Sequence, residues 1–137
     1  MVILFDQHNL PGNIFEVIFS TTQQVIVGRV LIDYMKKNGG SVSKSKLGQF
    51  ATKLNEGKVI TQIDEEPFRG KSIKLSYNKR QFYDRILTPL RAMGLIEYDL
   101  YNKTYKISEK FEKALVDISG MWKTEIVRKA VEVKFAD

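Results

Sequence analysis

The chain contains no cysteine, which excludes disulfide scaffolds, cysteine-ligated zinc fingers, iron–sulfur clusters and thiol nucleophiles. Long apolar runs are missing too: stretches such as Val25-Ile26-Val27 fall far short of the roughly 18–20 residues that a membrane-spanning helix needs. Met1 to Phe5 is followed at once by Asp6, without the basic start and longer apolar stretch of a secretory signal. We therefore expect a protein with no membrane span that is located in the cytoplasm.

Histidine is almost absent, since His8 is the single one. A histidine triad or a multi-histidine zinc site therefore has too few ligands, and glycine-rich phosphate loops are missing as well. The acidic run 64–66, followed by Lys71 and Lys74, is the remaining candidate for nuclease-type metal chemistry. However, neighbouring carboxylates in a strand point to opposite faces. We expect no enzymatic activity, no metal and no cofactor.

The 137 residues suffice for one domain, and 43% apolar with 28% charged residues is an ordinary globular composition. The net charge of +6 is distributed unevenly. Residues 36–85 hold twelve basic and five acidic residues, a net of +7, whereas the rest of the chain holds ten basic and eleven acidic residues. This concentration favours a phosphate-binding face. The alternative is a solvated, lysine-rich surface of the kind found in thermophilic proteins.

Turn and cap signals divide the first half of the chain. Two apolar runs, 2–5 and 14–19, flank Asn9-Leu10-Pro11-Gly12 and predict an N-terminal hairpin or arm. Capping residues at 20–22 precede a helix that continues to Met35 and ends at Asn38-Gly39-Gly40. A short strand at 41–43 and a second helix over about 44–54 follow, the latter because apolar residues recur at helical spacing.

The second half begins with an insertion. Residues 58–76 lose the helical period and predict a hairpin or an ordered loop. A third, two-faced helix follows over about 78–93, in which Pro89 should produce a kink or a division. Residues 95–107 alternate around a turn, which predicts a second hairpin whose tyrosines, Tyr101 included, pack in the strands. Ser108 then caps a further amphipathic segment, which we expect Gly120 to interrupt.

This order of elements, together with the segment Phe82-Tyr-Asp-Arg-Ile-Leu-Thr-Pro-Leu-Arg-Ala-Met-Gly-Leu-Ile-Glu-Tyr98, resembles the winged helix-turn-helix family, in particular small archaeal and bacterial transcription regulators. The resemblance covers about residues 21–119. It implies that the helix over 78–93 enters the DNA major groove and that the hairpin over 95–107 is the wing. The insertion 58–76 departs from the family pattern. It has two alternative roles, either to contact phosphate or to serve a structural purpose only.

The resemblance and the side-chain chemistry together nominate DNA contacts. Guanidinium and carboxamide groups can pair with the edges of guanine and adenine, so Arg80, Gln81 and Arg85 are the candidates for base contacts. Cations and hydroxyls near helix starts, and a cation at the wing, are suited to phosphates. The predicted backbone contacts are Tyr77, Lys79, Lys44, Lys46 and Lys103. The alternative is a solvated helix face on which Asp84 and Arg85 pair locally.

The expected fold is α+β and mainly helical, with an arm at 1–19, a winged-helix domain at 20–119 and an extension at 120–137. We expect a sequence-specific binder of double-stranded DNA that regulates transcription. The alternative function is a winged-helix protein–protein module in a larger nucleic-acid-processing assembly. Apolar residues beyond 120 exceed what the domain needs and predict a homodimer, unless they pack back on their own domain. These residues are Met121, Trp122, Ile126, Val127, Ala130, Val131 and Val133.

Overall fold

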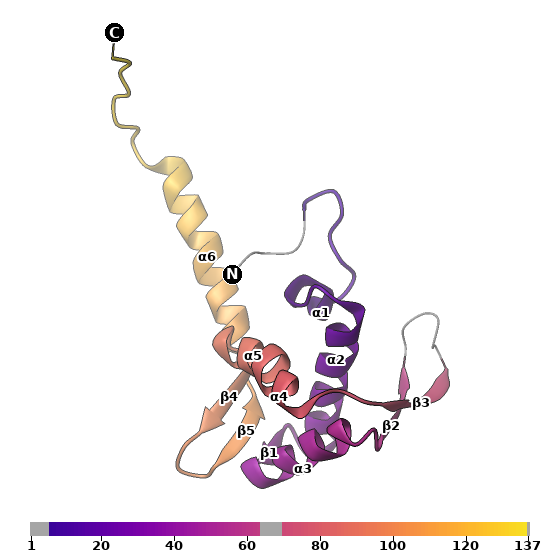
Figure 1. Ribbon diagram of the computed structural model, residues 1–137. Helices are drawn as coiled ribbons and strands as arrows, with labels where there is room; N and C mark the ends of the chain where they lie inside the picture. The colour runs from indigo at the N-terminus through magenta and orange to yellow at the C-terminus, as the bar shows by residue number, and fades with distance from the viewer. Residues whose placement is uncertain (1–5, 64–69, 137) are drawn as a thin grey trace.

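The computed structural model describes residues 6–63 and 70–136, and its class is α+β, as predicted (Figure 1). The elements are α1 (Ile14–Ile18), α2 (Thr22–Lys37), β1 (Ser41–Ser43), α3 (Lys44–Asn55), β2 (Val59–Ile63), β3 (Lys71–Leu75), α4 (Lys79–Phe82), the π-helical turn η1 (Tyr83–Leu87), α5 (Thr88–Ala92), β4 (Ile96–Asp99), β5 (Thr104–Ile107) and α6 (Lys110–Val127). Helices α2, α3 and the segment 79–92 enclose the apolar core.

Helix α2 begins where the capping signals predicted. Thr21 and Gln24 form a reciprocal capping box, in which the Thr21 hydroxyl accepts from the Gln24 N–H at 3.1 Å. Of the two alternatives predicted for the N-terminal segment, a hairpin or an arm, the hairpin is wrong at its second run, because residues 14–18 form helix α1, capped by the Asn13 side chain. A side chain at Gly28 would approach the Phe19 ring to 2.7 Å, so α2 leaves room for this ring. Packing on α2 thus overrides the β-branched pattern, and the run 2–5 lies outside the described residues.

Three strands form one antiparallel sheet in the order β1-β5-β4. The predicted hairpin over 95–107 is confirmed as β4 and β5, with Tyr98 opposite Tyr105. The strand at 41–43 is confirmed as β1, which pairs with β5 through Val42 opposite Tyr105. The backbone N–H of Lys44 donates to the carbonyl of Lys103 at 2.8 Å, so the start of α3 is tied to the hairpin turn.

The insertion is a hairpin in its described part. Strands β2 and β3 pair with each other in antiparallel register, Val59 opposite Leu75 and Ile63 opposite Lys71. Leu75 is buried, and Val59 and Ile73 pack against the core, so one face of the hairpin stabilises the domain. The acidic run 64–66 lies outside the described residues.

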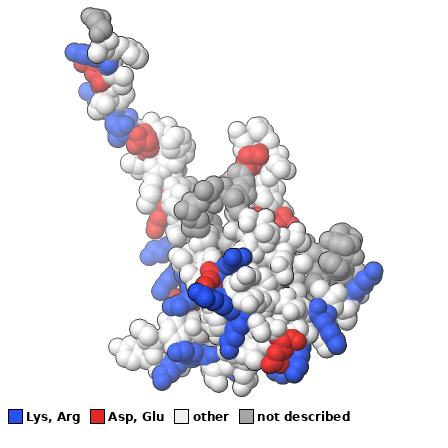
Figure 2. Space-filling view, viewed as in Figure 1, with Lys and Arg blue, Asp and Glu red and all other residues white. Residues whose placement is uncertain are grey.

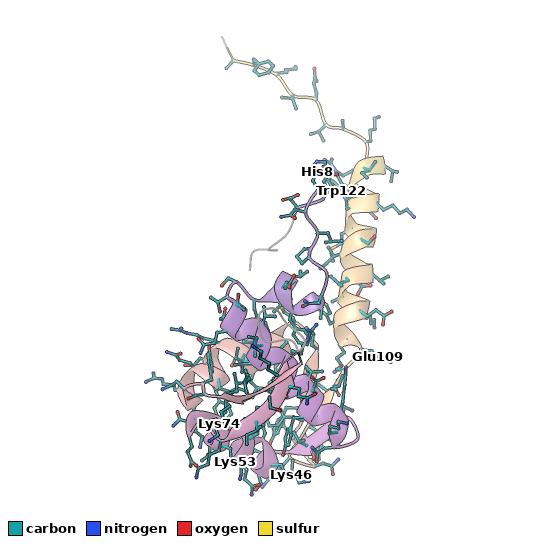
Figure 3. The ribbon with its side chains drawn as sticks, turned by 90° about the vertical axis from the view of Figure 1, so that its right-hand side faces the viewer. His8, Lys46, Lys53, Lys74, Glu109 and Trp122 are labelled. Atoms are coloured by element: carbon teal, nitrogen blue, oxygen red, sulfur yellow. The ribbon has the colours of Figure 1, made fainter. Side chains whose placement is uncertain are left out.

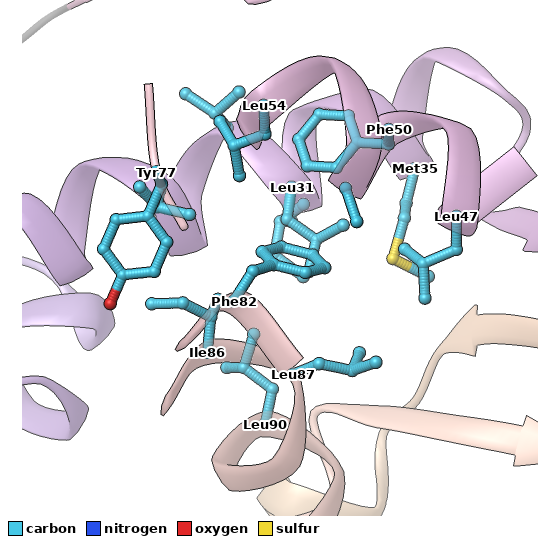
Figure 4. Packing of buried hydrophobic residues seen from close by; sticks show 14 of the residues in the cluster. Leu31, Met35, Leu47, Phe50, Leu54, Tyr77, Phe82, Ile86, Leu87 and Leu90 are labelled. Atoms are coloured by element: carbon cyan, nitrogen blue, oxygen red, sulfur yellow. The ribbon is translucent and has the colours of Figure 1, made fainter. Parts of the chain in front are cut away.

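The predicted third helix is one helical segment with an irregular centre. At η1 the N–H of Thr88 donates to the carbonyl of Tyr83, five residues back, in place of the usual four. Pro89 has no N–H to donate to the carbonyl of Arg85, so a regular turn would leave this carbonyl unpaired. Despite the irregular turn, Phe82, Ile86 and Leu90 remain fully buried (Figure 4).

Helix α6 differs from its prediction in two ways. It runs without a break through Gly120, so the expected boundary at 119/120 falls inside a helix. In the described part of the chain none of its residues is buried, and Figure 1 shows it extending away from the domain. Its first turn is attached near Gly94, whose carbonyl accepts from the Phe111 N–H at 3.1 Å.

Glu97 on β4 ties the hairpin to the start of α6. Its carboxylate oxygens lie 3.1 Å from Lys106 Nζ and 3.1 Å from Lys110 Nζ, and the Ser108 hydroxyl donates to it at 3.0 Å. These hydrogen bonds, first that from Lys106 and then those from Lys110 and Ser108, lower the pKa of Glu97 from 4.5 to about 2. The charged carboxylate therefore holds β4, β5 and α6 together.

Replacement of Gly94 by alanine is expected to destabilise the fold. Gly94 has a φ of +89°, and an added Cβ would lie 3.0 Å from the Phe111 backbone nitrogen and 3.1 Å from Lys110. A left-handed conformation with backbone crowding costs about 1–3 kcal/mol in the free energy of unfolding, which urea denaturation measures. Gly120→Ala is the control: its Cβ meets nothing and its helical position should gain up to about 1 kcal/mol. Equal effects of the two substitutions would contradict this account.

The Glu97 network predicts a pH dependence of stability. A lowered pKa in the folded chain means that the contribution of Glu97 is complete above about pH 4.5 and is lost as the pH falls toward 2. Glu97→Gln should lower the melting temperature at pH 7, and the difference from the wild type should shrink through this window. Thermal unfolding followed by circular dichroism measures it, and a difference that stays constant down to pH 2 would refute the network.

Candidate nucleic-acid interface

The outer face of the segment 79–92 is polar and exposed. Arg80, Asp84, Arg85 and Thr88 lie on it, while the opposite face is in the core. The expected alternative, a local pair of Asp84 with Arg85, is not the one formed: Asp84 Oδ2 lies 3.8 Å from Arg80 Nε. Both partners of this pair are exposed to solvent, where such a pair stabilises little. The guanidinium of Arg80 can thus exchange this weak partner for a ligand.

The start of this segment corrects one predicted contact. Tyr77, expected at phosphate, is only 6% exposed and packs in the core, and its N–H donates to the carbonyl of Leu54. The prediction assigned Tyr77 to the polar face by continuing the helical period backwards from the helix. The helix begins only at Lys79, after the cap residue Asn78, so this period does not apply to Tyr77. Gln81 is half-buried, which limits its reach as a base-contacting residue.

Lys79 remains at the surface, where two hydrogen bonds hold it against α3. Its backbone N–H donates to Asn55 Oδ1 at 2.8 Å, and its Nζ donates to Thr52 Oγ1 at 3.0 Å. The ammonium group is therefore positioned above α3 rather than along its own helix. Sequence spacing gave no indication of this contact, because the two elements are separated by the whole insertion.

Helix α3 adds a groove that the sequence did not predict. The groove has a volume of about 490 Å³ and lies between α3 and the starts of β2 and α4. Lys53, Lys58 and Lys79 bring ammonium groups to it, and Glu56 pairs with Lys58 at 3.0 Å. The other lining residues are small or polar: Ser45, Gly48, Gln49 and Thr52. Three ammonium groups against one carboxylate make the groove suited to an anionic backbone.

The two predicted lysines of the α3 start are exposed, as a backbone contact requires. Lys44 lies beside the hairpin turn through its hydrogen bond to the carbonyl of Lys103. Lys46 Nζ donates to Asn38 Oδ1 at 3.3 Å. Lys103 is exposed in the turn between β4 and β5 and has a φ of 49°. Lys44 and Lys103 thus place two cations beside one turn.

Arg91 connects the helical segment to the β4–β5 hairpin, a role absent from the predictions. Its guanidinium carbon lies 5.4 Å from the ring centre of Tyr98 and 5.6 Å from that of Tyr105. Burial raises the pKa of Tyr105, which therefore stays neutral at physiological pH. Cation–π contacts of this kind attach the end of α5 to both strands. Arg91 therefore packs the end of α5 against the hairpin.

Basic side chains gather on the face formed by these elements. Figure 2 shows Lys and Arg over the β4–β5 hairpin, over α4 and at the β2–β3 hairpin. In Figure 3, Lys46, Lys53 and Lys74 lie at the end of the molecule opposite to Trp122.

His8 is exposed, and its backbone N–H donates to Asp6 Oδ1. In the residues described, no group of three His, Cys, Asp or Glu side chains could hold a metal ion, and no helix has the length and apolarity to cross a membrane.

Comparison with known proteins relates the chain to a single family. No curated protein and no solved structure is significantly similar to it. A family model described as an archaeal family matches residues 46–128, which include most of α3, both hairpins and α6. Because this match covers more than half of the 137 residues, the chain belongs to that archaeal family.

Proposed function

We propose that this protein is a winged-helix protein that binds double-stranded DNA in a sequence-specific manner, without enzymatic activity, and regulates transcription. The observation that carries the proposal is the exposed arginine face of the segment 79–92, held next to the β4–β5 hairpin by Arg91. The order of elements and the sheet order β1-β5-β4 support it, since the hairpin then extends beside the helix as a wing would.

The dimensions and charges of the face suit duplex DNA. The segment 79–92 is about 21 Å long at 1.5 Å per residue, and a helix fits the major groove, which is roughly 12 Å wide. Arg80 and Arg85 would point to the base edges. Exposed cations at the α3 groove and at the hairpin turn would bind the phosphate strands beside the helix.

The alternative, a protein–protein module with an acidic partner, would use the same basic face. Two chemistries separate the two functions. Counterion release makes DNA affinity fall steeply with salt, with a logarithmic slope of about −0.9 per phosphate contact. Arginine side chains that make two hydrogen bonds to one base discriminate between base sequences. An acidic protein partner has no bases, so its binding would show no dependence on DNA sequence. The α3 groove and the exposed arginines favour DNA.

Two substitutions are expected to affect DNA binding differently. Arg85→Ala should cost about 1–3 kcal/mol on the preferred site and relax the preference at one base position. Lys103→Ala should weaken preferred and random duplexes alike and reduce the salt slope by about one. Fluorescence anisotropy over a range of salt concentrations, with sites selected from a random pool, measures both effects.

Lys129, which is exposed beyond α6 and away from this face, provides the matched control, since Lys129→Ala should leave affinity and slope unchanged. The DNA proposal would be refuted if the wild-type protein did not bind random duplex at about 50 mM salt, or if its affinity did not change with salt concentration. If Arg85→Ala weakened preferred and random duplexes equally, the helix would be a phosphate clamp only.

We also propose that two copies associate through α6. Val116 and Val127 lie on the other side of the helix and Glu125 interrupts the stripe, but seven of the nine apolar side chains of α6 fall within one stripe about 140° wide when projected at 100° per residue. These residues are Phe111, Ala114, Leu115, Ile118, Met121, Trp122 and Ile126. Most of them are exposed within the described chain, and an apolar stripe of this size marks an interaction surface. A second copy fits because two-fold symmetric operators require paired DNA-binding units.

A matched pair of substitutions tests this association. Trp122 and Val116 are equally exposed, at 66% and 65%, but Val116 lies outside the stripe. Trp122→Lys should weaken the dimer at least about tenfold, which corresponds to ~1.4 kcal/mol, whereas Val116→Lys should leave it intact. Sedimentation velocity measures both. A wild-type chain that remains monomeric at the concentrations used would overturn the dimer proposal while leaving DNA binding untouched.

A further inference from the structure

The turn between β4 and β5 presents two apolar side chains to solvent. Tyr101 is 98% exposed and its neighbour Leu100 is 78% exposed. The prediction that Tyr101 packs in the strands is therefore wrong. Only Tyr98 and Tyr105 of the three hairpin tyrosines pack, with ring centres 4.6 Å apart. Figure 2 shows uncharged atoms protruding at the lower left, where Figure 1 places this turn.

Hydrogen bonds hold the turn in one conformation. Asp99 Oδ1 accepts from the N–H groups of Tyr101 and Asn102 at 2.9 and 3.1 Å, and Asp99 Oδ2 accepts from Asn102 Nδ2 at 2.8 Å. The Thr104 hydroxyl donates to the carbonyl of Asn102 at 2.9 Å. The bonds from Asn102 are also the main cause that lowers the pKa of Asp99, so the carboxylate stays charged and the turn stays closed near neutral pH.

None of these bonds uses the ring of Tyr101 or the side chain of Leu100. Polar residues at both positions would leave the turn equally well closed, because its bonds come from Asp99, Asn102 and Thr104. The described part of the chain also offers no apolar cover for the tip. Two adjacent apolar side chains on a preorganised tip, which lose little entropy on binding, indicate a contact with a ligand.

We propose that Leu100 and Tyr101 enter the minor groove and wedge against a base-pair step, so that the bound duplex is bent. This inference rests on the proposed DNA binding and names an additional contact within it. Arg91 packs on Tyr98 and Tyr105 in the strands of the hairpin. With the segment 79–92 in the major groove, the tip of the same hairpin would extend toward the neighbouring groove. Lys44 and Lys103 lie at the base of the turn, where they would meet the two phosphate strands.

The chemistry of the tip suits this role. Apolar side chains inserted between bases partly unstack them and kink the duplex toward the major groove. Pyrimidine–purine steps unstack most readily, so the wedge would favour such a step at a fixed distance from the bases that Arg85 contacts. Tyr101 would act through its ring rather than its hydroxyl. The wedge would thus add sequence preference without a hydrogen bond to a base.

The test compares variants of the full chain on one duplex selected from a random pool. Fluorophores at both ends report bending by energy transfer, and 2-aminopurine placed at successive steps reports unstacking. Wild-type protein should shorten the end-to-end distance and raise 2-aminopurine emission at one step. Tyr101→Ala and Leu100→Ala should abolish both signals, and Tyr101→Ala should weaken binding about tenfold. Tyr101→Phe should behave as the wild type.

Leu10→Ala removes a side chain that is exposed to a similar degree but lies outside the hairpin, and it should change neither signal. A straight duplex with unchanged emission on wild-type binding, or bending that persists in Tyr101→Ala, would overturn the wedge while the DNA proposal stands. Absence of duplex binding by the wild type would overturn both. Circular dichroism of each variant verifies that the fold is retained.

Discussion

The burial of Phe82 determines which residues of the segment 79–92 face solvent. Its ring lies between side chains of α2 and α3, including Leu31 and Phe50, with the Phe50 ring centre 5.7 Å away (Figure 4). Phe82 lies in the first turn of the segment 79–92, so its insertion orients the whole segment. Burying an aromatic side chain of this size stabilises the fold by about 1.5–3 kcal/mol. With Phe82 inward, Arg80 and Arg85 face solvent.

Two further contacts extend this orientation to the rest of the chain. Arg91 holds the hairpin against the segment through the rings of Tyr98 and Tyr105, and Glu97 holds the hairpin against the start of α6. Lys46, Lys53 and Lys74 lie at one end of the molecule, while Trp122 on the apolar stripe of α6 lies toward the other (Figure 3). The proposed DNA-binding face and the proposed association helix would thus use separate surfaces.

Much of the fold was predictable because local signals agreed with tertiary packing. The capping box of Thr21, the stop at Gly39 and Gly40 and the alternation in 95–107 placed their elements correctly. Errors arose where packing competed with local pattern. Residues 14–18 form a helix on α2, and Tyr77 is buried in the core. Helix α6 continues through Gly120 because one glycine costs only about 1 kcal/mol in a helix. Arg91 and Lys79 contact residues that are distant in the sequence. Local periodicity of apolar residues cannot predict such contacts.

We propose that the outer face of 79–92 and the β4–β5 turn bind duplex DNA as one surface. The most direct measurement is the change of backbone amide resonances when isotopically labelled protein is titrated with a short selected duplex at low salt. We expect the largest shifts at residues 78–91 and 99–104, smaller ones along the α3 groove, and unchanged resonances in α6. Shifts confined to α6 or to α1 and α2, with residues 78–91 unaffected, would contradict it.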